Sequence, residues 1–173
     1  MVGRRVSAWL SSVGAIALSM VLMLGTVAMV WGSAPAIAQA DDFTKANLLN
    51  QDFSGQDLRN SEFTKASLRQ SDLSHTDLRG VSFFAANLER VDLTNADLRY
   101  ATLDSARFVN ANLTNANLEG AFASSAQFQG AIIDGADFTD VLLRNDAVDV
   151  LCEVAKGVNP TTGRATRDTL YCP

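Results

Sequence analysis

The sequence predicts an all-β solenoid, a coil whose sides are each five residues long, and three observations support this. Between residues 41 and 145 a large apolar residue recurs every five positions, and 20 of the 21 central positions hold Leu, Phe or Ile. A small residue lies two positions earlier, and 18 of these 21 positions hold Ala, Val, Ser or Thr. A period of five fits neither the 3.6-residue period of a helix nor the two-residue period of a strand. The chain must therefore turn after every unit, with both repeated positions facing inward.

The outward positions and the corners agree with this interpretation. The three remaining residues of each unit are mostly Asp, Asn, Thr, Ser, Arg and Gly, which suits a face exposed to solvent. Gly or Asn often ends a unit, as at Asn50, Gly55 and Gly80. These residues favour corners where the backbone needs a positive φ, so the sequence predicts a tight turn there.

Two places depart from the pattern. Ala123 occupies a central position and Phe122 comes one residue early, so we expect either a local bulge or a shift of Phe128 toward the gap. Gln51 and Gln56 stand where a small inward residue is expected. The first coil should therefore be less regular than the others.

The segments Ala-Asp-Leu-Arg-Tyr (96–100) and Ala-Asn-Leu-Thr-Asn (111–115) resemble the pentapeptide-repeat family, whose pattern is A-(D/N)-L-x-x. The resemblance covers 105 residues in 21 units. It implies a right-handed quadrilateral β-helix with four units, or about 20 residues, in each coil. The sequence supports the four sides independently, because like residues recur 20 positions apart, as in Phe43, Phe63 and Phe83. The repeats, residues 41–145, would then make about five coils.

Residues 1–40 differ from the repeats and are predicted to be a cleavable signal peptide. A pair of arginines precedes an uncharged, mostly apolar stretch from Val6 to Trp31, and Ala38-Gln39-Ala40 provides a small-residue cleavage motif. We expect cleavage between Ala40 and Asp41, after general rather than twin-arginine export. The alternative is a retained anchor, because the apolar stretch is long enough to span a bilayer.

Removal of this segment would leave one acidic domain. It would carry 12 Lys and Arg against 19 Asp and Glu, a net charge of −7. This balance argues against a nucleic acid or an anionic lipid surface as partner. A membrane would be contacted only through the signal segment, if that segment stays uncleaved.

Residues 146–173 break the period and are predicted to form a helical C-terminal cap over the last coil. A short helix is expected over 146–157, with Asn145 or Asp146 as its N-cap and Gly157 at its end. Residues 166–170 could add a further helical turn. The only two cysteines of the chain, Cys152 and Cys172, lie in this tail, and in an exported protein such a pair favours a disulfide. A regulatory thiol pair is the alternative.

The tail, from Leu151-Cys152 through Asn159-Pro160 to Tyr171-Cys172, resembles that of exported pentapeptide-repeat proteins from cyanobacteria and their chloroplast relatives. Those relatives are placed in the thylakoid lumen. This resemblance implies an exported location, in the thylakoid lumen or periplasm of a cyanobacterium-like cell. It implies no known activity.

No catalytic, cofactor-binding or metal site is predicted. An enzyme needs a pocket with converging polar groups, whereas the predicted interior is filled by Leu and Phe. His75 is the only histidine and falls at an outward corner, where a surface role is expected. Two cysteines and one distant histidine do not make a metal site.

The candidate interaction surface is one face of the rod, where Asp-Leu-Arg recurs 20 residues apart. The leucine points inward, so the acid and the base form two outward columns, which would either neutralise one another or dock a partner of matching repeat. A neighbouring column of acids has neutral unit partners and is the more acidic face. The nine residues are Asp57, Arg59, Asp77, Arg79, Asp97 and Arg99, and then Asp52, Asp72 and Asp92.

The sequence therefore favours a non-enzymatic exported protein, a rigid acidic rod that acts as an interaction or structural module for an unknown protein partner. One alternative is a DNA mimic that inhibits a topoisomerase, as some members of the family do. Another is a redox-sensitive lumenal scaffold controlled by the two cysteines. A homo-oligomer is a further possibility, because no sequence feature predicts a cap for the N-terminal coil.

Overall fold

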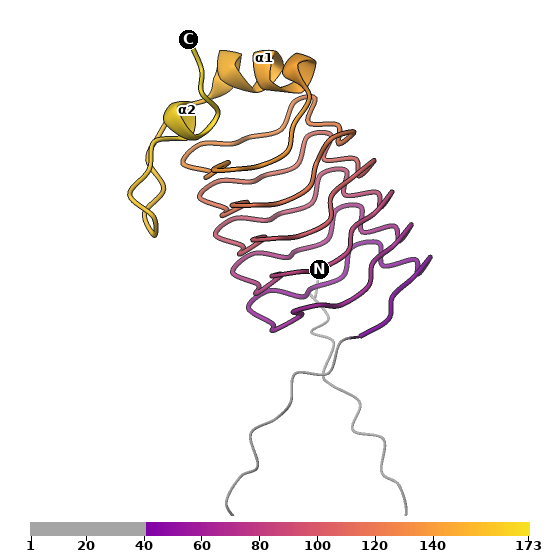
Figure 1. The fold of residues 1–173 in the computed structure, drawn as a ribbon. Coiled ribbons are helices and arrows are strands. Elements are labelled where there is room, and N and C mark those ends of the chain that lie inside the picture. The colour runs from indigo at the N-terminus through magenta and orange to yellow at the C-terminus, as the bar shows by residue number, and fades with distance from the viewer. Residues whose placement is uncertain (1–40) are drawn as a thin grey trace, which may run out of the picture. The chain divides into compact units, whose positions relative to one another are not determined.

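The computed structural model describes residues 41–173. The predicted signal peptide, residues 1–40 with its cleavage site after Ala40, lies outside the described residues. From residue 41 the chain winds into a stack of coils (Figure 1), and 17 parallel bridges each join residues 20 positions apart, from Asp42↔Glu62 to Phe122↔Leu142. The predicted right-handed quadrilateral β-helix is confirmed.

Each side of a coil is joined to the next coil by a fixed set of backbone hydrogen bonds. The second residue of a unit donates to the coil below, as Asp72 N–H does to Gln51 O (2.9 Å). The third and fifth residues donate to the coil above, as Leu73 N–H does to Asp92 O (2.7 Å) and His75 N–H to Thr94 O (2.9 Å). Stacking therefore satisfies the backbone of the inner coils, which a single coil could not do for itself.

The corner residues have the predicted positive φ. This conformation is also adopted at corners by residue types that do not favour it. The fifth residue has a positive φ from Lys45 to Asp140, with the exception of Ser125. Ala85 (φ 55°) and Tyr100 (φ 59°) adopt this conformation although a Cβ disfavours it. The three ladder hydrogen bonds on each side impose the turn on whichever residue stands there.

The interior is built from the central residues and the small residues two positions earlier. Ring centroids of Phe43 and Phe63 lie 4.7 Å apart, and those of Phe63 and Phe83 lie 5.1 Å apart, so the predicted phenylalanine column is a stack. Largest among the fully buried side chains are Phe63, Phe83, Phe108, Phe138, Leu68, Leu73, Leu78, Leu88, Leu93, Leu98, Leu103 and Leu113.

The two departures from the pattern have different outcomes. At Ala123 the small side chain still points inward and Phe122 is exposed, while the following corner at Ser125 loses its positive φ and its bond from the Ser105 amide. Phe128 stays stacked on Phe108, at 5.2 Å. The disturbance is therefore a broken corner rather than a shift of the ring.

The expectation of a less regular first coil is wrong for the backbone. Its bridges and positive φ values follow the same pattern as those of the inner coils. Gln51 and Gln56 are less buried than the small residues they replace, and the side-chain Nε2 of Gln51 donates to Leu49 O (3.1 Å). The ladder to the second coil sets this backbone, whatever side chain stands at the first position.

The C-terminal tail contains α1 (Asn145–Val154) and α2 (Thr166–Thr169) at one end of the stack (Figure 1). The expected side-chain cap of α1 is wrong: Arg144 is the N-cap residue, and its guanidinium holds the Asp146 carboxylate beside the helix instead. The helix also ends at Val154, before Gly157. The predicted disulfide between Cys152 and Cys172 is present. Within residues 41–173 no helix has the length and apolar character needed to cross a bilayer.

Candidate interaction surfaces

The Asp-Leu-Arg units form an ordered ladder of ion pairs. Arg59 Nε donates to Asp57 Oδ1 (2.8 Å) and its Nη2 to Oδ2 (2.7 Å), and the same two-pronged contact recurs at Asp77 with Arg79 and at Asp97 with Arg99. Each of these arginines is bound to the acid of its own unit. The six predicted residues therefore lie together, as two columns that neutralise each other.

Contacts between coils complete this ladder. Arg59 Nε lies 3.6 Å from Asp77 Oδ2, and Arg79 Nε lies 3.6 Å from Asp97 Oδ2. The side-chain hydrogen bonds that Arg79 donates to the Asp77 carboxylate lower the pKa of Asp77 and raise the pKa of Arg79. These side chains are substantially exposed, so solvent weakens the pairs and they add little stability. Their main effect is to fix the positions of the charges on this face.

The second acidic column is also brought together by the fold. Bridges join Asp52 to Asp72 and Asp72 to Asp92, so the three carboxylates lie one above another. Further up, the same column holds Asn112 and Ile132. The acidic face is therefore restricted to the lower coils.

These aspartates also have a structural role that the sequence interpretation missed. The carboxylate of Asp72 accepts a hydrogen bond from the Ser74 amide (2.9 Å), and Asp92 does so from the Thr94 amide (2.9 Å). Asn112 makes the same contact with the Thr114 amide (3.1 Å). Asp or Asn at the second position therefore closes a turn onto the fourth residue, which explains the D/N of the repeat pattern.

The tail contributes a cluster that the sequence did not reveal. Asn159 is fully buried, and its Nδ2 donates to the carbonyl groups of Asn115 (3.1 Å) and Gly135 (2.9 Å). Its Oδ1 accepts from the amides of Thr161 and Thr162. Asn159 thus fixes a turn of the tail and attaches it to the side of the rod.

Arg164, from the same turn, continues the ladder of ion pairs. Its Nε donates to Asp137 Oδ2 (2.7 Å) and its Nη2 to Glu119 Oε2 (2.5 Å). Burial raises the pKa of Asp137, but hydrogen bonds from Thr139, Thr162 and Arg164 outweigh it and hold this pKa below its usual range. A residue of the tail therefore supplies the base that the repeat itself lacks at this level.

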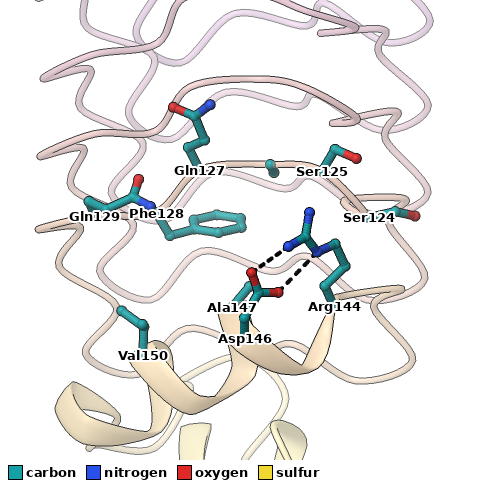
Figure 2. A pocket seen from close by; sticks show the side chains of 10 residues that line it. Ser124, Ser125, Gln127, Phe128, Gln129, Arg144, Asp146, Ala147 and Val150 are labelled. Atoms are coloured by element: carbon teal, nitrogen blue, oxygen red, sulfur yellow. Dashed lines mark hydrogen bonds and ion pairs between the residues drawn. The ribbon is translucent and has the colours of Figure 1, made fainter.

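A groove of about 300 Å³ separates the last coil from the start of α1 (Figure 2). The Arg144–Asp146 ion pair lies between the Ser124–Ser125 corner and the helix, and the ring of Phe128 points toward it. Ten residues line it: Ser124, Ser125, Ala126, Gln127, Phe128, Gln129, Arg144, Asp146, Ala147 and Val150.

The sole histidine and the candidate metal ligands were also located in the described part of the chain. His75 is exposed at a corner with positive φ, where the sequence placed it. Residues 41–173 contain no group of His, Cys, Asp and Glu side chains that could hold a metal ion.

Comparison with known families agrees with the geometry of the coils. A family model for pentapeptide repeats matches residues 42–74, 76–115 and 106–145, more than half of the chain. The chain belongs to the pentapeptide-repeat family.

Solved structures of other pentapeptide-repeat proteins resemble this one. One from the thylakoid lumen of Arabidopsis thaliana is 48% identical, with a TM-score of 0.71 over 82% of this chain and 97% of that chain. Another, Rfr23 from the cyanobacterium Cyanothece 51142, is 27% identical, with a TM-score of 0.59 over 61% of this chain and 86% of that chain.

A curated relative also matches part of this pentapeptide-repeat protein. Thylakoid lumenal 15 kDa protein 1 of the Arabidopsis thaliana chloroplast is 70% identical over 40 residues, which is 23% of this chain and 18% of that protein. This chain therefore spans less than a fifth of that relative's length. The relatives place this chain among pentapeptide-repeat proteins of the thylakoid-lumen type.

Proposed function

We propose that this pentapeptide-repeat protein is exported to a thylakoid lumen or an equivalent compartment, where it acts as a non-enzymatic module that binds another protein. The lumenal relatives and the predicted signal peptide support the location. The disulfide supports it too, because such bonds persist in oxidising compartments.

The observation that carries the proposed role is the contrast between a closed interior and pre-ordered outer columns. The central side chains of the inner coils, such as Leu73 and Leu93, are fully buried and leave the repeat without an internal binding chamber. Outside, ion pairs and turn hydrogen bonds hold Asp77, Arg79 and Asp72 in fixed positions. A surface ordered before binding loses little conformational entropy when a partner docks.

The acidic column of Asp52, Asp72 and Asp92 is the part of this surface with the strongest charge preference. A partner with basic side chains spaced to match the coils would complement it, and this charge complementarity would raise the association rate. The DNA-mimic alternative has less support, because the neighbouring Asp57–Asp97 column is neutralised by its own arginines.

The test uses Asn replacements, because the Asp carboxylates also close turns. A triple variant Asp52→Asn, Asp72→Asn, Asp92→Asn removes the charge and keeps the turn acceptor, as native Asn112 does one coil higher. The protein is crosslinked in its native compartment, and its partners are identified by mass spectrometry. We expect wild type to capture defined partner proteins and the triple variant to capture fewer of them.

Three outcomes would contradict parts of this proposal. Equal partner recovery by both proteins would eliminate the acidic column as the binding face. The absence of any defined partner would eliminate the interaction role. A protein found in the cytosol would eliminate export and revive the topoisomerase alternative.

A second candidate is the redox-sensitive scaffold, favoured by the position of the disulfide. Cys152 lies in α1 and Cys172 follows α2, so the bond joins the first helix of the cap to the end of the tail. Both residues are half-buried against the core. Reduction would loosen the cap and expose the last coil to self-association. Identical size-exclusion profiles with and without reductant would eliminate this candidate.

Pairing of two copies through the first coil stays a prediction. Phe43, Leu48 and Phe53 are only partly buried there, which fits such a contact. Sizing of the exported protein over a range of concentrations would test it.

A further inference from the structure

The tail lies on the edge of the last coil and supplies hydrogen-bond acceptors where a further coil would supply them. Gly135 N–H donates to Lys156 O (2.8 Å), where an inner coil would find the carbonyl of the coil above. Phe138 N–H donates to Thr169 Oγ1 (3.1 Å) in the same way. On each of two sides of the last coil, another segment of this chain therefore supplies an acceptor to one of the two amides.

The side formed by Ala126–Gly130 is left open. One coil below, Phe108 N–H donates to Gln127 O (2.7 Å) and Asn110 N–H donates to Gln129 O (2.9 Å). The equivalent groups of this side are the amides of Phe128 and Gly130 and the carbonyl of Ala126. Within residues 41–173 none of these three groups has a hydrogen-bond partner.

The open edge borders the groove beside α1 (Figure 2). Ala147 and Val150 of the helix form its apolar wall, and Val150 is 46% exposed. The only charges in the lining, on Arg144 and Asp146, are paired with each other at 3.0 and 2.5 Å. The groove therefore offers backbone hydrogen bonds and an apolar wall to an occupant without charge.

The extended segment at Lys156 shows which occupant fits. It pairs with the adjoining edge through its main chain, and each inner coil pairs with the coil below through one donor and two acceptors per side. An extended peptide carries these groups at the required spacing, whereas a helix has already used them. A volume of about 300 Å³ is small for a ligand site and suits a short segment.

We propose that the Ala126–Gly130 edge is a docking site for a short, extended, uncharged peptide segment of the partner protein, which adds as a strand in the groove beside α1. This inference rests on the proposed interaction role and names a surface for it. The partner would donate one amide to Ala126 O and accept hydrogen bonds from the Phe128 and Gly130 amides.

The experiment uses the exported protein, purified as its own cells process it, and a phage-displayed library of random peptides as the probe. Selected peptides are synthesised, and their affinities are measured by fluorescence anisotropy. We expect uncharged sequences rich in β-branched residues. Their binding should shift the NMR signals of the Phe128 and Gly130 amides and slow the exchange of these amides with solvent.

A matched pair of variants locates the site. Val150→Arg fills the groove, whereas Val154→Arg makes the same change one turn later at a residue with similar exposure, 50%. We expect Val150→Arg to weaken binding about tenfold or more and Val154→Arg to leave it within about twofold. Equal effects of the two variants, NMR shifts at the acidic column instead, or a library that yields no binding peptide would overturn the proposal.

Crosslinking in the native compartment separates this proposal from the broader one. If Val150→Arg captures the same partners as wild type, the groove is not the docking site, and the proposed interaction role still stands. If neither protein captures a partner, the interaction role itself fails. If Val150→Arg alone loses a partner, that partner holds the docking segment.

Discussion

Asp137 is the one charged side chain that is fully buried in the described part of the chain. Its carboxylate accepts hydrogen bonds from the Thr139 hydroxyl (2.6 Å) and amide (2.9 Å), and from Arg164 Nε (2.7 Å). A buried charge destabilises a fold unless it is paired, so this aspartate depends on the docked tail. The tail in turn is held partly by this contact.

The Asp137 contacts predict loss of stability in acid. An unfolded Asp titrates near pH 3.9, and the folded carboxyl has a lower pKa. The contribution of Asp137 to the free energy of unfolding is therefore complete above the unfolded pKa. It is lost as the pH falls through the lower, folded pKa. We expect the contribution of Asp137 to the free energy of unfolding to be constant above about pH 5 and to fall below about pH 4.

Urea unfolding measured from pH 7 to pH 2 tests this. Asp137→Asn should reduce the dependence of the free energy of unfolding on pH in the acid range. Asp140→Asn, a change at an exposed residue of the same coil, should leave this dependence unchanged. Equal acid slopes in wild type and Asp137→Asn would contradict the assignment.

At the scale of the elements, the C-terminal tail is a substitute for a further coil. Lys156 and Thr169 supply acceptors to the last coil, Leu151 and Ala155 are buried against the core, and the disulfide links the two ends of this segment. The short α2 would not be stable alone, since helices of this length need tertiary contacts. The cap therefore forms as one unit with the coil that it covers.

Removing the disulfide should destabilise this unit more than the rest of the rod. The bond closes a loop with a sequence separation of 20, worth about 3 kcal/mol in the chain-entropy model. We expect Cys152→Ser and Cys172→Ser each to speed hydrogen exchange of the Gly135 amide. The Leu73 amide, two coils or more away, should be much less affected. Equal loss of protection at both amides would show that cap and rod open together.

At the scale of the whole molecule, the fold is a one-dimensional stack. Each coil contacts its neighbours through bridges between residues 20 apart, so every inner coil supports two others. In such a stack the cost of a defect depends on whether both neighbours are present. Phe83 lies inside the stack and is fully buried, whereas Phe53 lies in the first coil and is only partly buried.

We therefore expect Phe83→Ala to lower the free energy of unfolding by about 3–5 kcal/mol. Phe53→Ala should cost clearly less, because this ring already has solvent on one side. Chemical denaturation of both variants provides the measurement. Equal costs would mean that the first coil is as well buried in solution as the inner ones.

Most of the coil could be predicted because its contacts repeat. Inward positions and turns recur with a period of five along the sequence, and the bridged neighbours lie 20 residues away, so one pattern encodes nearly all of the rod. The disulfide was also predictable, because only one pairing of two cysteines exists. The aspartates at the second position of the unit were predicted to form a surface. The hydrogen bonds by which their carboxylates close turns were not predicted.

The tertiary structure alone decided the features that occur only once. Arg164 reaches Glu119 across 45 residues of sequence, and Asn159 reaches Asn115 across 44, with no repeat to indicate either contact. The open Ala126–Gly130 edge follows from the path of the tail, whose Lys156 and Thr169 supply acceptors to other sides of the last coil. The sequence by itself determined the rod, because side chains that are buried at regular intervals produce a repeating pattern of apolar residues in the sequence. Docking of the tail depends on the shape of a finished coil, which exists only after the chain has folded.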